Sequence, residues 1–443
     1  MASIVADDLN SRAMTDTFFD GTASSIVSLA FALTLSASVL LQFWLASRQV
    51  RHVARHRSSV PLAFAGKISA TAHRRAADYT LAKARFGLIE LGFSVVVALG
   101  WTLFGGLSAL NQFLLSWLAA GLTQQVALMV AFVAISGMLD LPFTLYQTFV
   151  IEQHFGFNKT SLALWVQDFV RSMALALIIG VPLLSLALWM MGATGTLWWL
   201  WTWCLWMVFN VTALLVYPTW IAPLFNKFQP LEDPVVKDRV SQLMTRSGFT
   251  SSGFFVMDGS KRSAHANAYF TGFGASKRVV FYDTLLTQLS PPEVDAVLAH
   301  ELGHFKRRHI IKRVVSMFSI SLIGFFALGW LSQQMAFFTG LGVSPNRVGS
   351  NDALALLLFM LILPLAGTFL GPLFAQMSRK HEFEADAYAA DQTSATDLAS
   401  ALLKLYEDNA STLTPDPVFV KFYYSHPPAT ERLGRLLATG ASN

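Results

Sequence analysis

The sequence contains almost no cysteine and little charge. Cys204 is the only cysteine among 443 residues and lies inside an apolar run, which excludes both an internal disulfide framework and a zinc site built from thiolates. Charged residues make up only 13% of the chain, whereas a soluble domain carries roughly a quarter. Hydrophobic residues make up 54%, and the mean hydropathy is +0.49. These values predict a protein that lies mostly in a lipid bilayer.

Two other signals are missing. Residues 1–25 have no basic segment and carry four aspartates, so they are not typical of a cleaved signal peptide, and we expect the first apolar run to be retained as a membrane span. The net charge is only +5, and the basic residues flank apolar runs instead of alternating with aromatic side chains. A nucleic-acid partner is therefore not expected.

Seven apolar runs reach the length of about 20 residues that a helix needs to cross a bilayer. They cover residues 25–47, 86–110, 113–151, 172–191, 197–217, 314–338 and 353–374. The third run is too long for one crossing, so we interpret it as one span with a helical extension. The predicted organisation is a membrane region of five spans (1–217), a polar insert (218–313), two further spans (314–376) and a polar C-terminal segment (377–443).

The distribution of basic residues predicts the orientation. Residues 48–85 contain nine lysines and arginines and a single acid, Asp78, whereas the connectors after the second, fourth and sixth spans contain almost none. Basic loops stay in the cytoplasm, so both polar blocks are expected on the cytoplasmic side. The prediction is a multi-pass protein of a bacterial inner membrane, or of the endoplasmic reticulum if the host is eukaryotic.

The polar insert reads as a small α+β domain. Residues 254–257 and 278–282 have strand-like composition, and residues 267–270 precede glycines at 272 and 274, which suggests a hairpin. Two prolines at 291 and 292 are typical of a helix start. The fold class is thus an α-helical integral membrane protein with about seven transmembrane helices and a small cytoplasmic α+β domain.

The helix that follows contains the most informative stretch of the chain, His300-Glu301-Leu302-Gly303-His304. On a helix, positions i and i+4 share one face, so His300 and His304 can hold one metal ion together. Glu301 then lies beside that ion, where its carboxylate can take a proton from a water molecule. This pattern predicts a zinc metallopeptidase with one zinc ion per chain.

A catalytic zinc site needs a third protein ligand, and residues 378–386 offer three candidates. Glu382 is the best of them, because Asp386 shares its helical face and can accept a proton from a ligand imidazole. His381 and Glu384 compete, but they point roughly 100° and 200° away from Glu382 on a helix. An ordinary acidic helix start remains the alternative.

Together these residues resemble the type I CAAX prenyl endopeptidases, which are membrane-embedded zinc metallopeptidases of the gluzincin group. The H-E-x-x-H motif at 300–304 and the E-x-x-x-D motif at 382–386 are separated by two spans, as in that family. Further similar stretches lie at 151–160, 221–228, 267–272, 280–286, 425–428 and 431–433. The first 80 or so residues carry no recognised motif.

The resemblance implies a bundle of seven helices that encloses a large chamber, with the zinc site at its cytoplasmic end. It implies that His300, His304 and Glu382 are the zinc ligands, that Glu301 is the general base and that Asp386 supports a ligand. It also implies that His426 can donate to the oxyanion and that Arg432 orients this region, unless Arg432 merely pairs near Glu431. An edge strand on which a substrate can lie is implied for Asn267, Ala268, Tyr269 and Phe270; a buried hairpin is the alternative.

Two other histidines are assigned lesser roles. His309 follows three basic residues, and we interpret this run as a cytoplasmic anchor, not as a set of ligands. His265 lies near the proposed strand, where it can contact substrate but is not expected to bind the metal.

The function predicted is hydrolysis of peptide bonds near the C-terminus of a peptide or protein substrate, prenylated or otherwise associated with the bilayer. One alternative is a quality-control membrane protease of the heat-shock type. A second is a non-enzymatic metal-binding scaffold or transporter, although transporters place their ion ligands near the membrane midplane and not at span ends.

Overall fold

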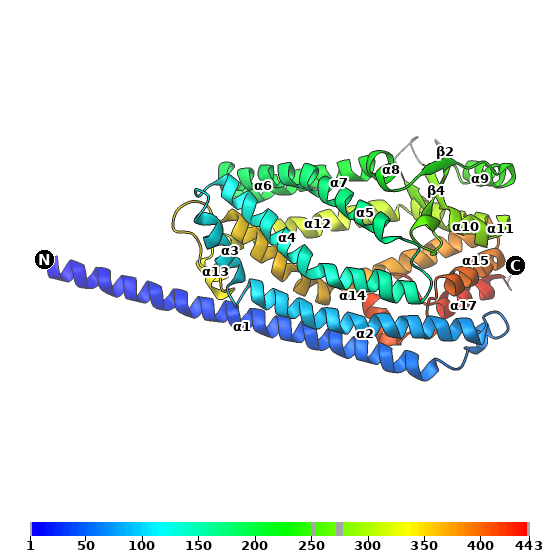
Figure 1. The fold of residues 1–443 in the computed structure, drawn as a ribbon, viewed down its shortest axis with the longest axis horizontal. Coiled ribbons are helices and arrows are strands. Elements are labelled where there is room, and N and C mark those ends of the chain that lie inside the picture. Colours follow the sequence, from blue (N-terminus) through cyan, green and yellow to red (C-terminus); the bar gives the residue numbers. More distant parts are fainter. Residues whose placement is uncertain (1, 250–252, 272–277, 441–443) are drawn as a thin grey trace.

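Long helices that lie side by side make up most of the molecule, and short elements gather at both ends (Figure 1). The structure is a computed structural model that describes residues 2–249, 253–271 and 278–440; for residues 2–20, 271, 439 and 440 it describes the backbone only. Seven of the described helical segments are long and apolar enough to cross a membrane. Their main helices are α1 (Ala2–His56), α2 (Ala70–Trp101), α4 (Leu122–Tyr146), α5 (Leu162–Leu175) with α6 (Val181–Ala193), α7 (Trp198–Val216), α12 (His309–Leu331) and α14 (Asp352–Gln392).

The predicted number of spans is confirmed, but the predicted span ends at 110 and 338 and the predicted span start at 113 are wrong. Helix α2 ends at Trp101, a left-handed Gly105 turns the chain, and α3 (Gly106–Leu115) forms a separate helix before α4. Similarly, α12 ends at Leu331 and is followed by the short helix α13 (Met335–Gly340). Hydropathy hides these turns because α3 and α13 are themselves apolar: Leu107 and Phe338 are buried against the bundle.

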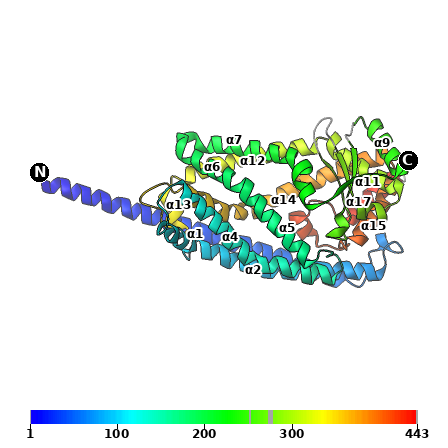
Figure 2. The ribbon, with the colours of Figure 1, turned by 45° about the horizontal axis from the view of Figure 1, so that its top comes forward.

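A four-stranded sheet lies at the end of the bundle opposite the N-terminus (Figure 2). The strand order is β1 (Phe228–Pro230), β2 (Gly253–Met257), β4 (Arg278–Tyr282), β3 (Ala268–Thr271), and only the β2–β4 pair is parallel. The hairpin prediction is confirmed, because β3 pairs antiparallel with β4; its glycine turn lies outside the described residues. The helices at this end are α8 (Ala222–Phe225), α9 (Pro234–Arg246), α10 (Asp283–Gln288), α11 (Pro291–Lys306), α15 (Ala395–Asp408), α16 (Pro417–Tyr423) and α17 (Ala429–Gly440).

We call this the sheet end of the molecule, and we call the end that holds α3 and α13 the far end. Each has its own apolar core: Leu302, Phe281 and Val240 are fully buried at the sheet end, and Leu357 and Leu107 at the far end. A cavity of about 1170 Å³ lies within the bundle, lined mainly by α6, α7, α12 and α14. A large space inside the bundle is therefore present, but none of the three predicted zinc ligands lines it.

The connection between α1 and α2 lies at the sheet end (Figure 1). Phe64 from this connection is buried in the sheet-end core, and Arg48 at the end of α1 forms an ion pair of 3.0 Å with Asp416, just before α16. The basic segment 48–85 and the two polar blocks thus meet at one end of the bundle, as the positive-inside argument requires.

Candidate active site

Helix α11 begins at a well-defined N-terminus. Ser290 caps it, and the Glu293 side chain accepts from the Ser290 backbone N–H at 2.7 Å, which completes a capping box. Glu293 is also bonded to Lys404 of α15 at 2.7 Å. With its start held in this way, α11 presents His300 and His304 one turn apart, and their Nε2 atoms lie 3.2 Å from each other.

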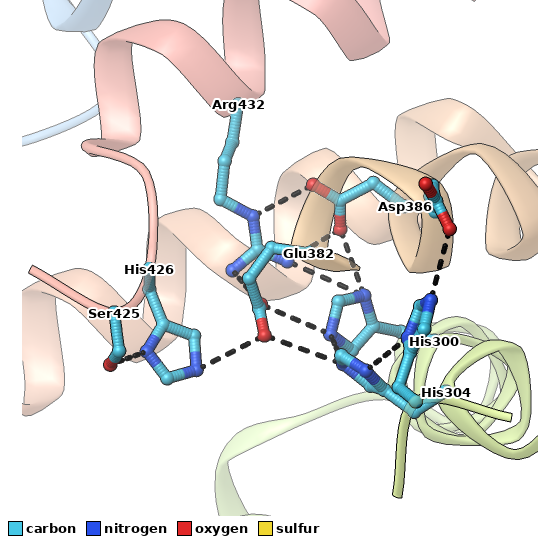
Figure 3. A network of polar contacts seen from close by, with 9 residues as sticks. His300, His304, Glu382, Asp386, Ser425, His426 and Arg432 are labelled. Atoms are coloured by element: carbon cyan, nitrogen blue, oxygen red, sulfur yellow. Dashed lines mark hydrogen bonds and ion pairs between the residues drawn. The ribbon is translucent and has the colours of Figure 1, made fainter. Parts of the chain in front are cut away.

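Glu382 of α14 faces these two imidazoles (Figure 3). Its carboxylate oxygens lie 3.4 Å from the Nε2 atoms of both His300 and His304. The approach depends on Gly303, because a Cβ there would lie 3.0 Å from the Ala385 Cα. The glycine of the H-E-x-x-H motif therefore allows α11 and α14 to pack closely enough for the carboxylate to reach the histidines.

The three side chains fit a divalent metal ion. One donor atom from each lies within 4.8 Å of the others, and Glu382 Oε2 is buried without a hydrogen-bond partner. Two imidazole nitrogens and one carboxylate oxygen form the donor set of catalytic zinc sites. A buried oxygen without a partner costs free energy, and a cation between the three groups would remove that cost. The roles of His300, His304 and Glu382 as ligands stay a prediction that this geometry supports.

The competing candidates on α14 point elsewhere. The His381 ring stacks on His309 with centroids 4.0 Å apart, and Glu384 Oε2 lies 3.0 Å from His309 Nε2. The helical phase of α14 therefore leaves only Glu382 directed at the two histidines of the motif.

Asp386, held by Arg432, supports His300 at its Nδ1 atom, whereas Glu382 faces the Nε2 atom of the same ring (Figure 3). His300 Nδ1 donates to Asp386 Oδ1 at 2.9 Å, and the Arg432 guanidinium from α17 binds both oxygens of Asp386. Burial alone would lower the pKa of His300, but the carboxylates of Asp386 and Glu382, 2.9 and 3.4 Å from its ring nitrogens, raise this pKa to about 9. The pocket therefore stabilises positive charge at this imidazole, whether a proton or a metal ion supplies it.

Glu301 and His426 line a second cavity, of about 820 Å³, together with the candidate ligands His300 and Glu382 and with Arg432. Burial raises the pKa of Glu301, which makes its carboxylate a better base near neutral pH. His426 lies 3.4 Å from Glu382 through Nε2 and 2.9 Å from Ser425 Oγ through Nδ1 (Figure 3). All the predicted catalytic groups thus border one space.

Strand β3 lies at the edge of the sheet beside this cavity. Of the four residues predicted to bind substrate, Asn267 and Ala268 line the cavity, whereas Tyr269 and Phe270 line a smaller pocket against α7 and α12. Along a strand, successive side chains point to opposite faces, so these residues do not present a single surface. Their common feature is the backbone of an edge strand, which is the part that pairs with an extended peptide.

The sequence is similar to known proteins over most of its length. Residues 49–227 match the family described as "CAAX prenyl protease N-terminal, five membrane helices", and residues 230–439 match peptidase family M48. The protein named CAAX prenyl protease 1 of Saccharomyces cerevisiae is 32% identical over 92% of this chain and 96% of its own length. The chain belongs to the CAAX prenyl protease family.

Other members of the CAAX prenyl protease family are also similar to this chain, in sequence and in structure. A homologue from Arabidopsis thaliana is 33% identical over 85% of this chain and 89% of its own length. The crystal structure of S. mikatae Ste24p superposes with a TM-score of 0.86 at 30% identity, covering 93% of this chain and 99% of that one. The chain is therefore a multi-pass membrane metalloendopeptidase, and the predicted fold class and reaction type are confirmed.

Two residues of this CAAX prenyl protease family member had interpretations that the structure narrows. Of the two for Arg432, the geometry favours a role at the site over pairing near Glu431: its side chain is 6% exposed and contacts both Asp386 and Glu382, and these carboxylates raise its pKa against the effect of burial. Residues 306–308 are exposed, as an anchor would be, but His309 does not belong with them: its side chain is only 5% exposed and contacts His304. Periodicity could not find this contact, because α11 ends between the two histidines.

His265 also lines the cavity, as its predicted proximity to substrate requires. It stacks on Phe157 with centroids 4.4 Å apart, and its Nδ1 lies 3.1 Å from Asn409 Oδ1. It is not part of the cluster around Glu382. The only sequence signal for its placement was its position just before β3.

Proposed function

We propose that this chain is a zinc-dependent membrane endopeptidase that cleaves peptide bonds near the C-terminus of prenylated or other membrane-associated substrates. The observation that carries the proposal is the convergence of His300, His304 and Glu382 on one point, beside a cavity that Glu301, His300 and Glu382 line. The curated relatives named CAAX prenyl protease 1 support the choice of substrate. The charge distribution supports an active site on the cytoplasmic side, in a bacterial inner membrane or in the endoplasmic reticulum of a eukaryote.

His300, His304 and Glu382 would hold the zinc ion. When bound, zinc would act as a Lewis acid that polarises the scissile carbonyl and lowers the pKa of a water molecule toward neutral pH. Glu301 takes the proton of the attacking water and passes it to the leaving amine. Its raised pKa suits both steps, because the same carboxyl group must accept a proton and then release it.

His426 acts on the side of this centre that faces the substrate, and Arg432 acts behind the centre. The His426 ring borders the cavity and lies within 3.4 Å of Glu382, so its Nε2–H can donate to an oxyanion that develops there. Arg432 is less free to approach the oxyanion, because Asp386 binds its guanidinium. Arg432 therefore keeps Asp386 and Glu382 in place and neutralises their charge.

Strand β3 would position the substrate. A peptide that adds to the free edge of β3 takes an extended conformation with its carbonyls in fixed register. Asn267 and Ala268 line the cavity at the start of this strand, so the peptide would run from the sheet toward Glu301. The apolar cavity within the bundle ends at Ser425, beside His426, and offers space for an apolar group carried by the substrate.

The test uses the purified full-length protein in detergent. We expect about one zinc ion per chain, chelator-sensitive cleavage of a farnesylated C-terminal CAAX peptide, and slower cleavage of the same peptide without its lipid. A protein that binds zinc and degrades a misfolded membrane protein but not the farnesylated peptide would favour the quality-control alternative. A protein that binds zinc and cleaves neither would leave the non-enzymatic scaffold.

A further inference from the structure

His309 provides a second link between α14 and the candidate metal centre. Its Nδ1 lies 3.0 Å from His304 Nδ1, and its Nε2 lies 3.0 Å from Glu384 Oε2. His304 uses its other nitrogen, Nε2, to face His300 and Glu382. The three side chains therefore form a continuous chain of contacts from a carboxylate, through one imidazole, to the back of a candidate ligand.

The backbone between the helices places His309 there. Helix α11 ends at Lys306, Arg308 adopts a left-handed conformation with φ of 56°, and α12 begins at His309 itself. A left-handed conformation is unfavourable for a residue with a Cβ. The chain accepts this cost at a turn that returns the His309 ring to His304 and buries it to 5% exposure.

The chemistry of the three groups determines the direction of both hydrogen bonds. A carboxylate only accepts, so His309 Nε2–H must donate to Glu384. In a neutral imidazole the other nitrogen is an acceptor, so His309 Nδ1 accepts from His304 Nδ1–H. That leaves His304 Nε2 without a proton and with its lone pair directed at Glu382 and His300. This tautomer is the one in which His304 can bind a metal ion.

We propose that His309 and Glu384 are positioning residues that orient the His304 ring and hold it in its metal-binding tautomer. The proposal rests on the metal site assigned under the proposed function. His381 completes the arrangement: its ring stacks on His309 with an interplanar angle of 12° and so restricts rotation of the His309 ring. His304 is thus supported through a neutral intermediary, whereas His300 contacts the carboxylate of Asp386 directly.

The experiment measures zinc affinity by competition with a chromophoric chelator, in full-length protein purified in detergent. Groups behind a ligand typically change metal affinity by about 10–100-fold, so we expect a loss of that size for His309→Ala. His309→Asn should recover most of the affinity, because its side-chain oxygen can accept from His304 Nδ1–H. Glu384→Ala should lose about tenfold, and the double variant should bind no more weakly than His309→Ala, because the residues act in series.

Two matched variants serve as controls. His73 of α2 is also buried, at 2% exposure, and bonds the backbone carbonyl of His56 in α1; His73→Ala should keep the affinity of the unmodified protein. Glu407 is an exposed carboxylate on α15, and Glu407→Ala should do the same. The cobalt-loaded forms give an independent readout, since the visible absorption of the ion responds to the orientation of His304 and not to turnover.

Unchanged affinity for His309→Ala or Glu384→Ala, or simple addition of their effects, overturns the proposal. If His309→Ala does not fold, the comparison of Glu384→Ala with Glu407→Ala decides alone. If the unmodified protein binds no metal, the proposed function fails as well. If that protein binds metal and every variant binds it equally, only the positioning role of His309 and Glu384 is wrong.

Discussion

The two histidines of α11 have the same role in the predicted metal site but are supported in opposite ways. His300 contacts a buried ion pair directly: Asp386 and Arg432 are each 6% exposed in their side chains. His304 contacts the neutral ring of His309, and the carboxylate behind that ring, Glu384, is 30% exposed. On the His300 side, a buried charge contacts the ligand directly. On the His304 side, a neutral ring separates the ligand from a carboxylate that reaches water.

The difference separates two tasks that one helix performs. A buried ion pair cannot lose one partner without leaving the other charge unpaired, so the His300 side holds the C-terminal helix α17 against α14 as well as orienting a ligand. The His304 side contributes little to that packing, and its terminal carboxylate can exchange its partner for water. Changes on the first side should affect stability and chemistry together, and changes on the second should affect chemistry alone.

The largest expected effect lies between the two sides, at Glu301. Glu301→Gln should lower kcat by about 10²–10⁴-fold, because the amide cannot carry the proton from water to the leaving amine. Metal content and thermal stability should stay unchanged, since neither supporting network includes this residue. Steady-state cleavage of a farnesylated peptide together with metal analysis tests this; cleavage at more than a tenth of the normal rate would exclude Glu301 as the base.

Exchanging one carboxylate on each side tests the comparison directly. Asp386→Asn should weaken zinc binding by about 10–100-fold and lower the unfolding temperature, because Arg432 loses its charged partner. Glu384→Gln should weaken binding only a few-fold and leave the unfolding temperature unchanged, because the amide oxygen still accepts from His309 and the site reaches water. Equal losses of stability in both variants would show that the two sides do not differ.

Gly303 controls the distance between the helices that carry both sides. In Gly303→Ala the new Cβ meets the Ala385 Cα and carbonyl oxygen at 3.0 and 3.1 Å. Backbone atoms cannot move aside as a flexible side chain can, so we expect a loss of about 1–3 kcal/mol and weaker metal binding at both histidines. Gly434→Ala in α17, where no atom lies within 4 Å, is the control and should be neutral or slightly stabilising.

The smallest expected effect is at the start of α11 and should not distinguish the two sides. Burial on its own would raise the pKa of Glu293, but hydrogen bonds from Lys404, Ser400 and Ser290 lower it to about 2, below the ordinary 4.5. A lowered pKa stabilises the fold above pH 4.5, and this contribution is lost as the pH falls toward 2. Glu293→Gln should therefore cost about 1–2 kcal/mol at neutral pH.

Thermal unfolding of Glu293→Gln at pH 7 and pH 3 measures this. The deficit relative to the unmodified protein should be smaller at pH 3, where the unmodified protein has lost part of its own stabilisation. A deficit that is the same at both pH values would mean that the charge of Glu293 does not contribute.

Local patterns were enough to predict much of this molecule. Span number follows from hydropathy, and the pairing of His300 with His304 follows from helical periodicity, because both depend on neighbours along the chain. The choice of Glu382 over His381 and Glu384 was harder, since it depends on the rotation of α14 about its axis relative to α11. The spacing to Asp386 favoured the face of Glu382, and of these three residues Glu382 is the one that turns toward His300 and His304.

Contacts across a turn could not be predicted. His309 is five residues after His304, but the helix breaks between them at Arg308, so no regular spacing relates the two rings. The breaks before α3 and α13 were missed for a related reason: their side chains are as apolar as the spans that precede them, and only packing at the far end reveals the turns.

Helix α14 runs from Asp352 to Gln392, with Pro364 and Pro372 inside it, so the segment that spans the bundle and the segment that holds Glu382 belong to one helix. A bilayer that is too thick or too thin for a span changes the tilt of that span, and tilting one part of a continuous helix displaces the other part. Membrane thickness would thereby change the distance of the Glu382 carboxylate from His300 and His304. We expect turnover in vesicles to vary with acyl-chain length even when every vesicle holds the same folded, zinc-loaded protein.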